Sequence, residues 1–178
     1  MTAFDTPDYR RFDFCTLVYA RGLATVDETA RDAHREWLLE HGYGIDTLDC
    51  SGGIGPTLTR LGALLRWEEN FGYAMGPDTR SLDALNDGFE FDMPMGGARA
   101  LEVLRPDLAW AEDARWTLGL LATAMLHSQV HLATGRRFLT LAVLPADSPM
   151  IGAVVEDAYA VPPPKPLREP KLLWRPSP

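Results

Sequence analysis

The sequence predicts an α/β protein in which a small parallel sheet of about three strands is flanked by helices. Strand-like and helix-like stretches alternate along the 178 residues, an order that favours parallel strands joined by helical crossovers. Residues 138–144 form a nearly continuous apolar run, as expected of a strand buried inside a sheet. With 46% hydrophobic and 24% charged residues, the chain has the composition of a soluble domain large enough to bury a core.

The chain is expected to open with an extra strand and helix. Residues 12–20 are rich in aromatic and β-branched side chains and alternate in polarity, which predicts a strand. Thr25-Val26-Asp27-Glu28 fits the capping box that begins a helix, and the helix is expected to end near Gly42. These elements form the N-terminal extension, residues 1–43, which is expected to pack on the core.

Residues 44–146 are expected to form the central domain. Its first strand covers residues 45–50 and is followed by a glycine-rich turn over 51–56. Leucines at helical spacing then predict an amphipathic helix that runs through Trp67.

The second half of this domain begins with a long loop over residues 69–80. Ser81 is the expected N-cap of the next helix, which ends before Pro94. The remaining elements are a strand over 100–104, an apolar helix over 112–134 and the apolar strand over 138–144.

Residues 147–178 form a C-terminal extension that ends in a proline-rich tail. Half of the 14 prolines lie in the last 18 residues, where four basic residues oppose one acid. Such a composition favours an extended segment.

The chain is expected to be cytoplasmic. Its N-terminus lacks the basic and apolar regions of a signal peptide, and its longest apolar run is too short to span a bilayer. The two cysteines, Cys15 and Cys50, lie in strand-like stretches. They are expected to be buried free thiols rather than a disulfide framework.

The charge of the chain is concentrated in one segment. The formal net charge is −8, and residues 67–92 hold seven acids against the single base Arg80. A concentrated negative field attracts a positively charged partner and argues against direct binding of nucleic acid. A solvated face kept acidic for solubility is the alternative explanation.

Residues 82–89 combine this charge with a helical pattern. At helical spacing Leu82, Leu85 and Phe89 share one stripe, whereas Asp83 and Asp87 lie one turn apart on the other side. Like charges at this spacing repel each other by about 0.2–0.5 kcal/mol. The first-turn Asp83 complements the helix dipole, but Asp87 lies near the C-terminus, where the dipole disfavours an anion. The pair therefore indicates a binding surface.

Residues 71–87 resemble the signature of the barstar family, the protein inhibitors of barnase-like ribonucleases. In this signature a loop with aromatic residues and glycine, here Phe71-Gly72-Tyr73, leads into Leu-Asp-Ala-Leu-x-Asp, here residues 82–87. The expected order of strands and helices extends the resemblance to about 100 residues, 44–144.

The resemblance implies an inhibitor that is not an enzyme and needs no cofactor or metal. In the family, carboxylates of this helix and loop enter the nuclease's catalytic pocket in place of RNA phosphates. The implied partner is a basic ribonuclease or related nuclease toxin, with no direct contact to nucleic acid or membrane, and the free protein is expected to be a monomer. The expected partner-binding residues are Tyr73, Asp78, Asp83, Asn86, Asp87 and Glu90.

Two other functional interpretations remain open. His127 and His131 are spaced to share a metal and, with Asp83 and Asp87, to form a small metal-dependent enzyme. The proline-rich tail is alternatively the working part of a protein-interaction module. The glycines at 52–55 are placed like a phosphate cradle but lack the rest of either nucleotide-binding motif, so a tight turn is expected there.

Overall fold

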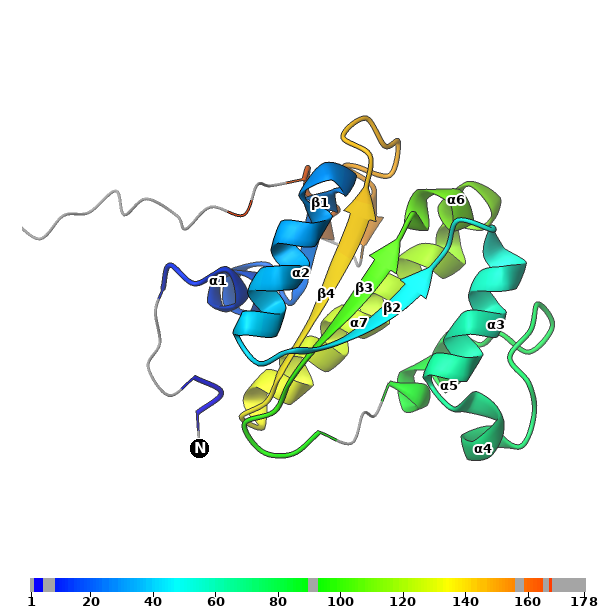
Figure 1. Ribbon diagram of the computed structural model, residues 1–178. Helices are drawn as coiled ribbons and strands as arrows, with labels where there is room; N and C mark the ends of the chain where they lie inside the picture. Colours follow the sequence, from blue (N-terminus) through cyan, green and yellow to red (C-terminus); the bar gives the residue numbers. More distant parts are fainter. Residues whose placement is uncertain (1, 5–8, 90–92, 156–158, 165–166, 168–178) are drawn as a thin grey trace, which may run out of the picture.

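The protein is an α/β structure built on a four-stranded parallel sheet. The computed structural model describes residues 2–4, 9–89, 93–155, 159–164 and 167. The strand order is β1-β4-β3-β2, so that β4 and β3 lie in the centre (Figure 1). The strands are β1 (Leu23–Asp27), β2 (Gly44–Asp49), β3 (Ala98–Leu104) and β4 (Arg137–Leu144).

Helices cover both faces of the sheet, as predicted. In Figure 1, α1 and α2 lie in front of the sheet and α7 lies behind it. Side chains alternate between the faces: Leu139 and Leu141 join the core under α1 and α2, whereas Phe138 joins the core under α7. The helices on the first face are α1 (Phe12–Tyr19) and α2 (Arg31–Glu40); those on the second are α3 (Ile54–Leu64), α4 (Trp67–Phe71), α5 (Leu82–Gly88), α6 (Pro106–Glu112) and α7 (Ala114–Ala133).

The N-terminal secondary structure differs from the prediction. Residues 12–19 form the helix α1, because Asp13, Phe14, Thr16 and Leu17 are buried along one helical face. The extra strand lies later, at β1, where its backbone pairs with one side of β4. The capping box predicted at residues 25–28 is also wrong, because Thr25 lies within β1. Asp27 provides the cap by accepting a hydrogen bond from the Thr29 amide.

The central domain follows the predicted order with two additions. The helix expected to run through Trp67 ends at Leu64, because Arg66 adopts a left-handed conformation and a separate short helix, α4, begins after it. The helix α6 was not predicted. It starts at Pro106, a residue suited to the first turn of a helix.

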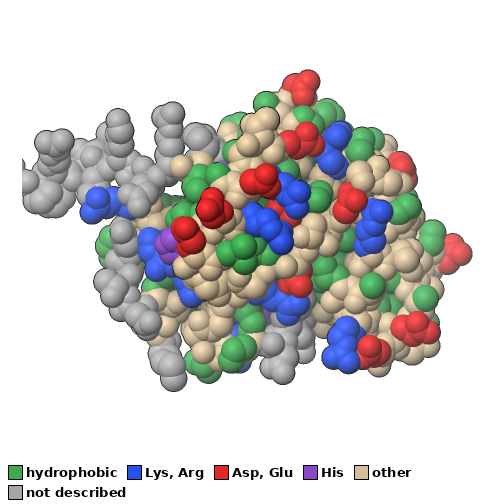
Figure 2. All heavy atoms as spheres, in the orientation of Figure 1, with side chains coloured by type: hydrophobic (Ala, Val, Ile, Leu, Met, Phe, Trp, Pro, Cys, Tyr) green, Lys and Arg blue, Asp and Glu red, His purple; other side chains and the backbone are tan. Residues whose placement is uncertain are grey.

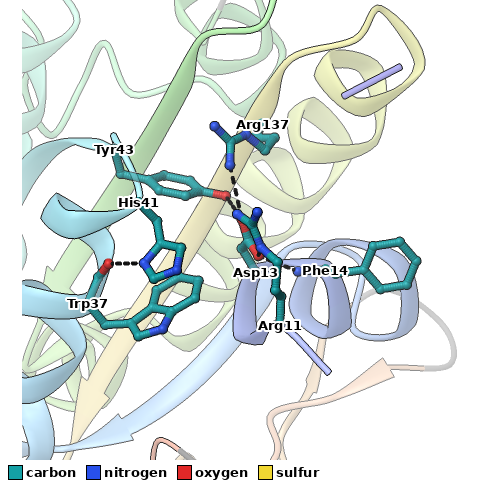
Figure 3. A network of polar contacts seen from close by, with 7 residues as sticks. All are labelled: Arg11, Asp13, Phe14, Trp37, His41, Tyr43 and Arg137. Carbon is teal, nitrogen blue, oxygen red and sulfur yellow. Dashed lines mark hydrogen bonds and ion pairs between the residues drawn. The ribbon is translucent and has the colours of Figure 1, made fainter. Parts of the chain in front are cut away.

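A buried carboxylate joins α1 to the sheet (Figure 3). Asp13 is fully buried, and Arg11 donates to its two oxygens at 3.0 and 2.7 Å. Tyr43 donates its hydroxyl at 2.8 Å, and Arg137 of β4 donates at 3.2 Å. Burial raises the pKa of Asp13, but hydrogen bonds from Arg11 and Tyr43 and the charge of Arg11 outweigh it, so the pKa lies below 3.8.

A second buried carboxylate, Glu102 of β3, is held by α2 on the same face. Arg31 binds both its oxygens at 2.9 and 2.8 Å, and Arg35 approaches at 3.3 Å. Figure 2 shows basic and acidic side chains side by side across this face of the molecule. The face carrying α2 therefore mixes both signs of charge, and its Arg31 and Arg35 are paired with Glu102.

The C-terminal extension contributes two short antiparallel strands, β5 (Val154–Val155) and β6 (Tyr159–Ala160). Val155 and Val161 are buried in the core beneath α7, and the Thr25 hydroxyl donates to the Pro162 carbonyl at 2.6 Å. Most of the proline-rich tail lies outside the described residues. Among the described helices, none combines the length and the hydrophobicity that crossing a membrane requires.

No disulfide joins the two cysteines. Cys50 is buried at the end of β2, and burial raises the pKa of its thiol to about 11, so it stays protonated at neutral pH. Cys15 differs from the prediction, because it is only half-buried and lies in a helix.

Candidate functional site

The acidic helix α5 divides its side chains as predicted. The Ser81 hydroxyl caps it by accepting from the Ala84 amide at 3.4 Å. Leu85 and Phe89 are buried, whereas Asp83 and Asp87 are exposed. One side of this short helix is therefore fixed to the core, and the other presents two carboxylates to solvent.

The helix α5 is seated between α7 and α4. The Phe89 ring lies 5.9 Å from the His127 ring of α7 and 6.3 Å from Phe138 of β4. On the other side, a Cβ atom at Gly88 would lie 3.0 Å from the Trp67 ring of α4. A seven-residue helix has little stability of its own, so these contacts set the direction of its acids.

The aromatic loop before α5 packs on the same tryptophan. The Tyr73 ring is 6.1 Å from the Trp67 ring in an edge-on arrangement and remains 38% exposed. Asp78 is exposed farther along the loop, which the Thr79 hydroxyl closes by donating to the Ala74 carbonyl at 3.0 Å. A hollow of about 510 Å³ opens beside this loop, and its lining includes Trp67 and Met75.

Three of the predicted acids lie within the described part of the chain, and none of the three is paired with a cation there. Among the described residues, Asp78, Asp83 and Asp87 form no ion pair. Arg80, the single base of the acidic segment, instead pairs with Asp113 at 2.7 Å. The surface around α5 therefore keeps a negative field that a cationic partner would neutralise.

Asn86 is exposed on α5 and also contacts the core. Its Oδ1 lies 3.2 Å from Nε2 of His127. The side chain thus links the exposed surface of α5 to α7. The remaining predicted contact, Glu90, lies outside the described residues.

The histidines of α7 are packing residues beneath α5. His127 and His131 are both buried, and His131 has no hydrogen-bond partner within the part of the chain that the structure describes. Burial, His127 and the charge of Arg136 lower the pKa of His131 below 6.5. No group of three or more metal-binding side chains occurs among the described residues. The alternative cluster with Asp83 and Asp87 is therefore not assembled there.

The glycine-rich turn binds a carboxylate of the chain itself. Gly53 has a φ of 81°, and the Ile54 amide at the start of α3 donates to Glu112 at 3.0 Å. A Cβ atom at Gly53 would lie 2.0 Å from that carboxylate. The Glu112 carboxylate at the end of α6 thus occupies the place in which a phosphate cradle would hold its ligand.

The sequence did not reveal the pairing of Arg80 with Asp113. Only the capping role of Asp113 could be predicted from the sequence, because an aspartate that precedes a long apolar helix is a typical N-cap. Asp113 caps α7 by accepting from the Trp116 amide at 3.0 Å. Its second contact joins residues 33 positions apart along the chain, and no local pattern encodes it. No protein-family model matches the chain, and no match was found among curated proteins or solved structures.

Proposed function

We propose that the protein is a barstar-like inhibitor that binds a basic ribonuclease or related nuclease toxin and occludes its active site. The observation that carries this proposal is the state of Asp83 and Asp87, which are both exposed and form no ion pair among the described residues. Their helix is held by Phe89 and Leu85 in the core. The proposed inhibitor is cytoplasmic, is monomeric when free, and performs no chemistry of its own.

The chemistry of the partner explains why carboxylates suit this role. A ribonuclease presents cationic side chains to a phosphodiester, and charge-assisted hydrogen bonds to carboxylates satisfy the same donors. Two acids on a fixed helix satisfy these donors with little loss of backbone freedom. The neighbouring exposed acids Glu68 and Asp78 act mainly on the association rate.

The order of elements also supports the proposal. Between residues 44 and 144 the chain runs β2, α3, α5, β3, α7, β4, which is the order that the resemblance implies. The short helices α4 and α6 are additions to it. Neither addition forms part of the exposed surface of α5. Trp67 of α4 packs against the buried side of α5, and Glu112 of α6 binds the turn before α3.

Competitive inhibition tests this function directly. The protein should be titrated against several small basic microbial ribonucleases while RNA cleavage is measured. For a recognised enzyme the KM for RNA should rise with inhibitor concentration while kcat stays constant, because inhibitor and substrate share one site. Absence of inhibition across the set, or a fall in kcat at constant KM, would argue against active-site occlusion.

Removal of the proline-rich tail should leave inhibition intact. The truncation should delete residues 165–178 and no more, because Val161 is buried and the Pro162 carbonyl accepts a hydrogen bond from Thr25. We expect an inhibition constant within about twofold of that of the full chain, since Asp83 and Asp87, the acids proposed to meet the partner, lie outside the deleted segment. A tenfold or greater loss would favour the tail as the interacting part.

A further inference from the structure

Arg80 lies beside two carboxylates and pairs with one of them. Arg80, Asp83 and Asp113 line one hollow, together with Leu82, Arg115 and Trp116. The Arg80 guanidinium is 2.7 Å from Asp113. It forms no ion pair with Asp83, although both side chains line the same hollow.

We propose that Asp113 is a positioning residue that holds Arg80 away from Asp83 and thereby keeps Asp83 available to a cationic partner. The proposal rests on the proposed function, because it concerns the acid that would meet the partner. It adds a residue at the N-cap of α7 that the resemblance does not include. It also explains why a base is compatible with the acidic segment.

The environment of Asp113 explains why Arg80 pairs with it. One oxygen of Asp113 accepts from the Trp116 amide at 3.0 Å, and the other faces Arg80. The carboxylate is thus fixed at the start of a 20-residue helix and is about three-quarters buried. Asp83 is exposed on a seven-residue helix, where an ion pair gains less because water screens it and side-chain freedom is lost.

Loss of the Asp113 charge should redirect Arg80. Within the hollow, Asp83 is then the carboxylate that remains for this guanidinium. Pairing with Arg80 would neutralise Asp83 and make a partner's cation compete with an intramolecular one. Arg115, which is exposed in the same hollow, is unchanged in every variant below.

Asp113→Asn separates the charge from the helix cap. Asparagine keeps the side-chain oxygen that caps α7, because it is as good an N-cap as aspartate. With a ribonuclease that the protein inhibits, Asp113→Asn should lower the association rate about three- to tenfold at low ionic strength. The double variant Arg80→Ala/Asp113→Asn should restore the rate, since it lacks the competing cation. A purely structural role of Asp113 would not be rescued in this way.

A second measurement needs no ribonuclease. The guanidinium NMR resonances of Arg80 should be recorded with and without Asp83→Asn, in the wild-type and Asp113→Asn backgrounds. We expect Asp83→Asn to shift them only in the Asp113→Asn background, where Arg80 has moved to Asp83.

The two readouts separate failure of this inference from failure of the proposed function. If no ribonuclease is inhibited but the resonances respond as expected, the proposed function fails. The inference that Asp113 holds Arg80 away from Asp83 then stands. Resonances that respond equally in both backgrounds would overturn the inference. An unchanged association rate in Asp113→Asn, or a slow rate that persists in the double variant, would overturn it as well.

Discussion

Replacing Asp13 with alanine is expected to lower the free energy of unfolding by about 3–5 kcal/mol, the usual effect of removing one partner from a buried ion pair. The Asp13 carboxylate is fully buried and accepts from Arg11, Tyr43, Arg137 and the Phe14 amide. Without it, Arg137, which is only 15% exposed, keeps a charge with no counterion in this cluster. Urea denaturation followed by circular dichroism measures the change.

Tyr43→Phe is the matched control for this prediction. It removes one hydrogen bond to the same carboxylate and leaves both arginines paired, so a loss of about 1–2 kcal/mol is expected. If Asp13→Ala and Tyr43→Phe lowered the free energy of unfolding equally, the ion pairs of Asp13 would not be what stabilises the packing of α1 on the sheet.

The same cluster predicts a pH dependence of stability. Because the folded pKa of Asp13 lies below 3.8, its stabilising contribution is complete above that pH and is lost as the pH falls through the folded pKa. The stability difference between the wild type and Asp13→Asn should therefore be constant from neutral pH to about pH 5 and shrink below pH 4. A difference that grew on acidification would contradict the assigned direction of the shift.

Phe89→Ala is expected to destabilise the protein by about 3–5 kcal/mol, as is usual for deleting a buried aromatic ring. Phe89 is fully buried against His127 and Phe138. Its loss also removes the residue that seats the C-terminal end of α5. Partner affinity should therefore fall even in conditions where the variant is folded, although no acid has been changed.

Leu39→Ala provides the control for Phe89→Ala. Leu39 is 57% exposed on α2, on the other face of the sheet, so its truncation should change stability by less than about 0.5 kcal/mol. Calorimetry of ribonuclease binding should compare the wild type, Phe89→Ala and Leu39→Ala at a temperature where all three are folded. An affinity loss measured there reflects the placement of α5 and not unfolding. Wild-type affinity in folded Phe89→Ala would show that α5 does not depend on this ring.

The sequence predicted the centre of the fold better than its N-terminus. The apolar run over β4 and the glycine after α7 act locally, so they could be read from the sequence. Residues 12–19 alternate like a strand, yet they form a helix whose buried face packs on the sheet, where Asp13 bonds to Arg137 and Tyr43, which are distant in the sequence. Tertiary contacts of this kind override local propensity.

The exposed acids of the site were predictable, and their surroundings were not. Helical spacing separates Asp83 and Asp87 from Leu85 and thus predicts their exposure. By contrast, the pairing of Arg80 with Asp113 depends on how α5 and α7 meet in space.

The most direct test of the central claim compares two double variants with the same charge change and the same helical spacing. Asp83→Asn/Asp87→Asn alters α5, whereas Asp32→Asn/Glu36→Gln alters exposed acids on α2, across the sheet. For a ribonuclease that the wild type inhibits, we predict that the α5 variant raises the dissociation constant at least about thirtyfold, or roughly 2 kcal/mol. The α2 variant should stay within about threefold of the wild type. Equal effects of the two variants would contradict the claim that α5 is the binding surface.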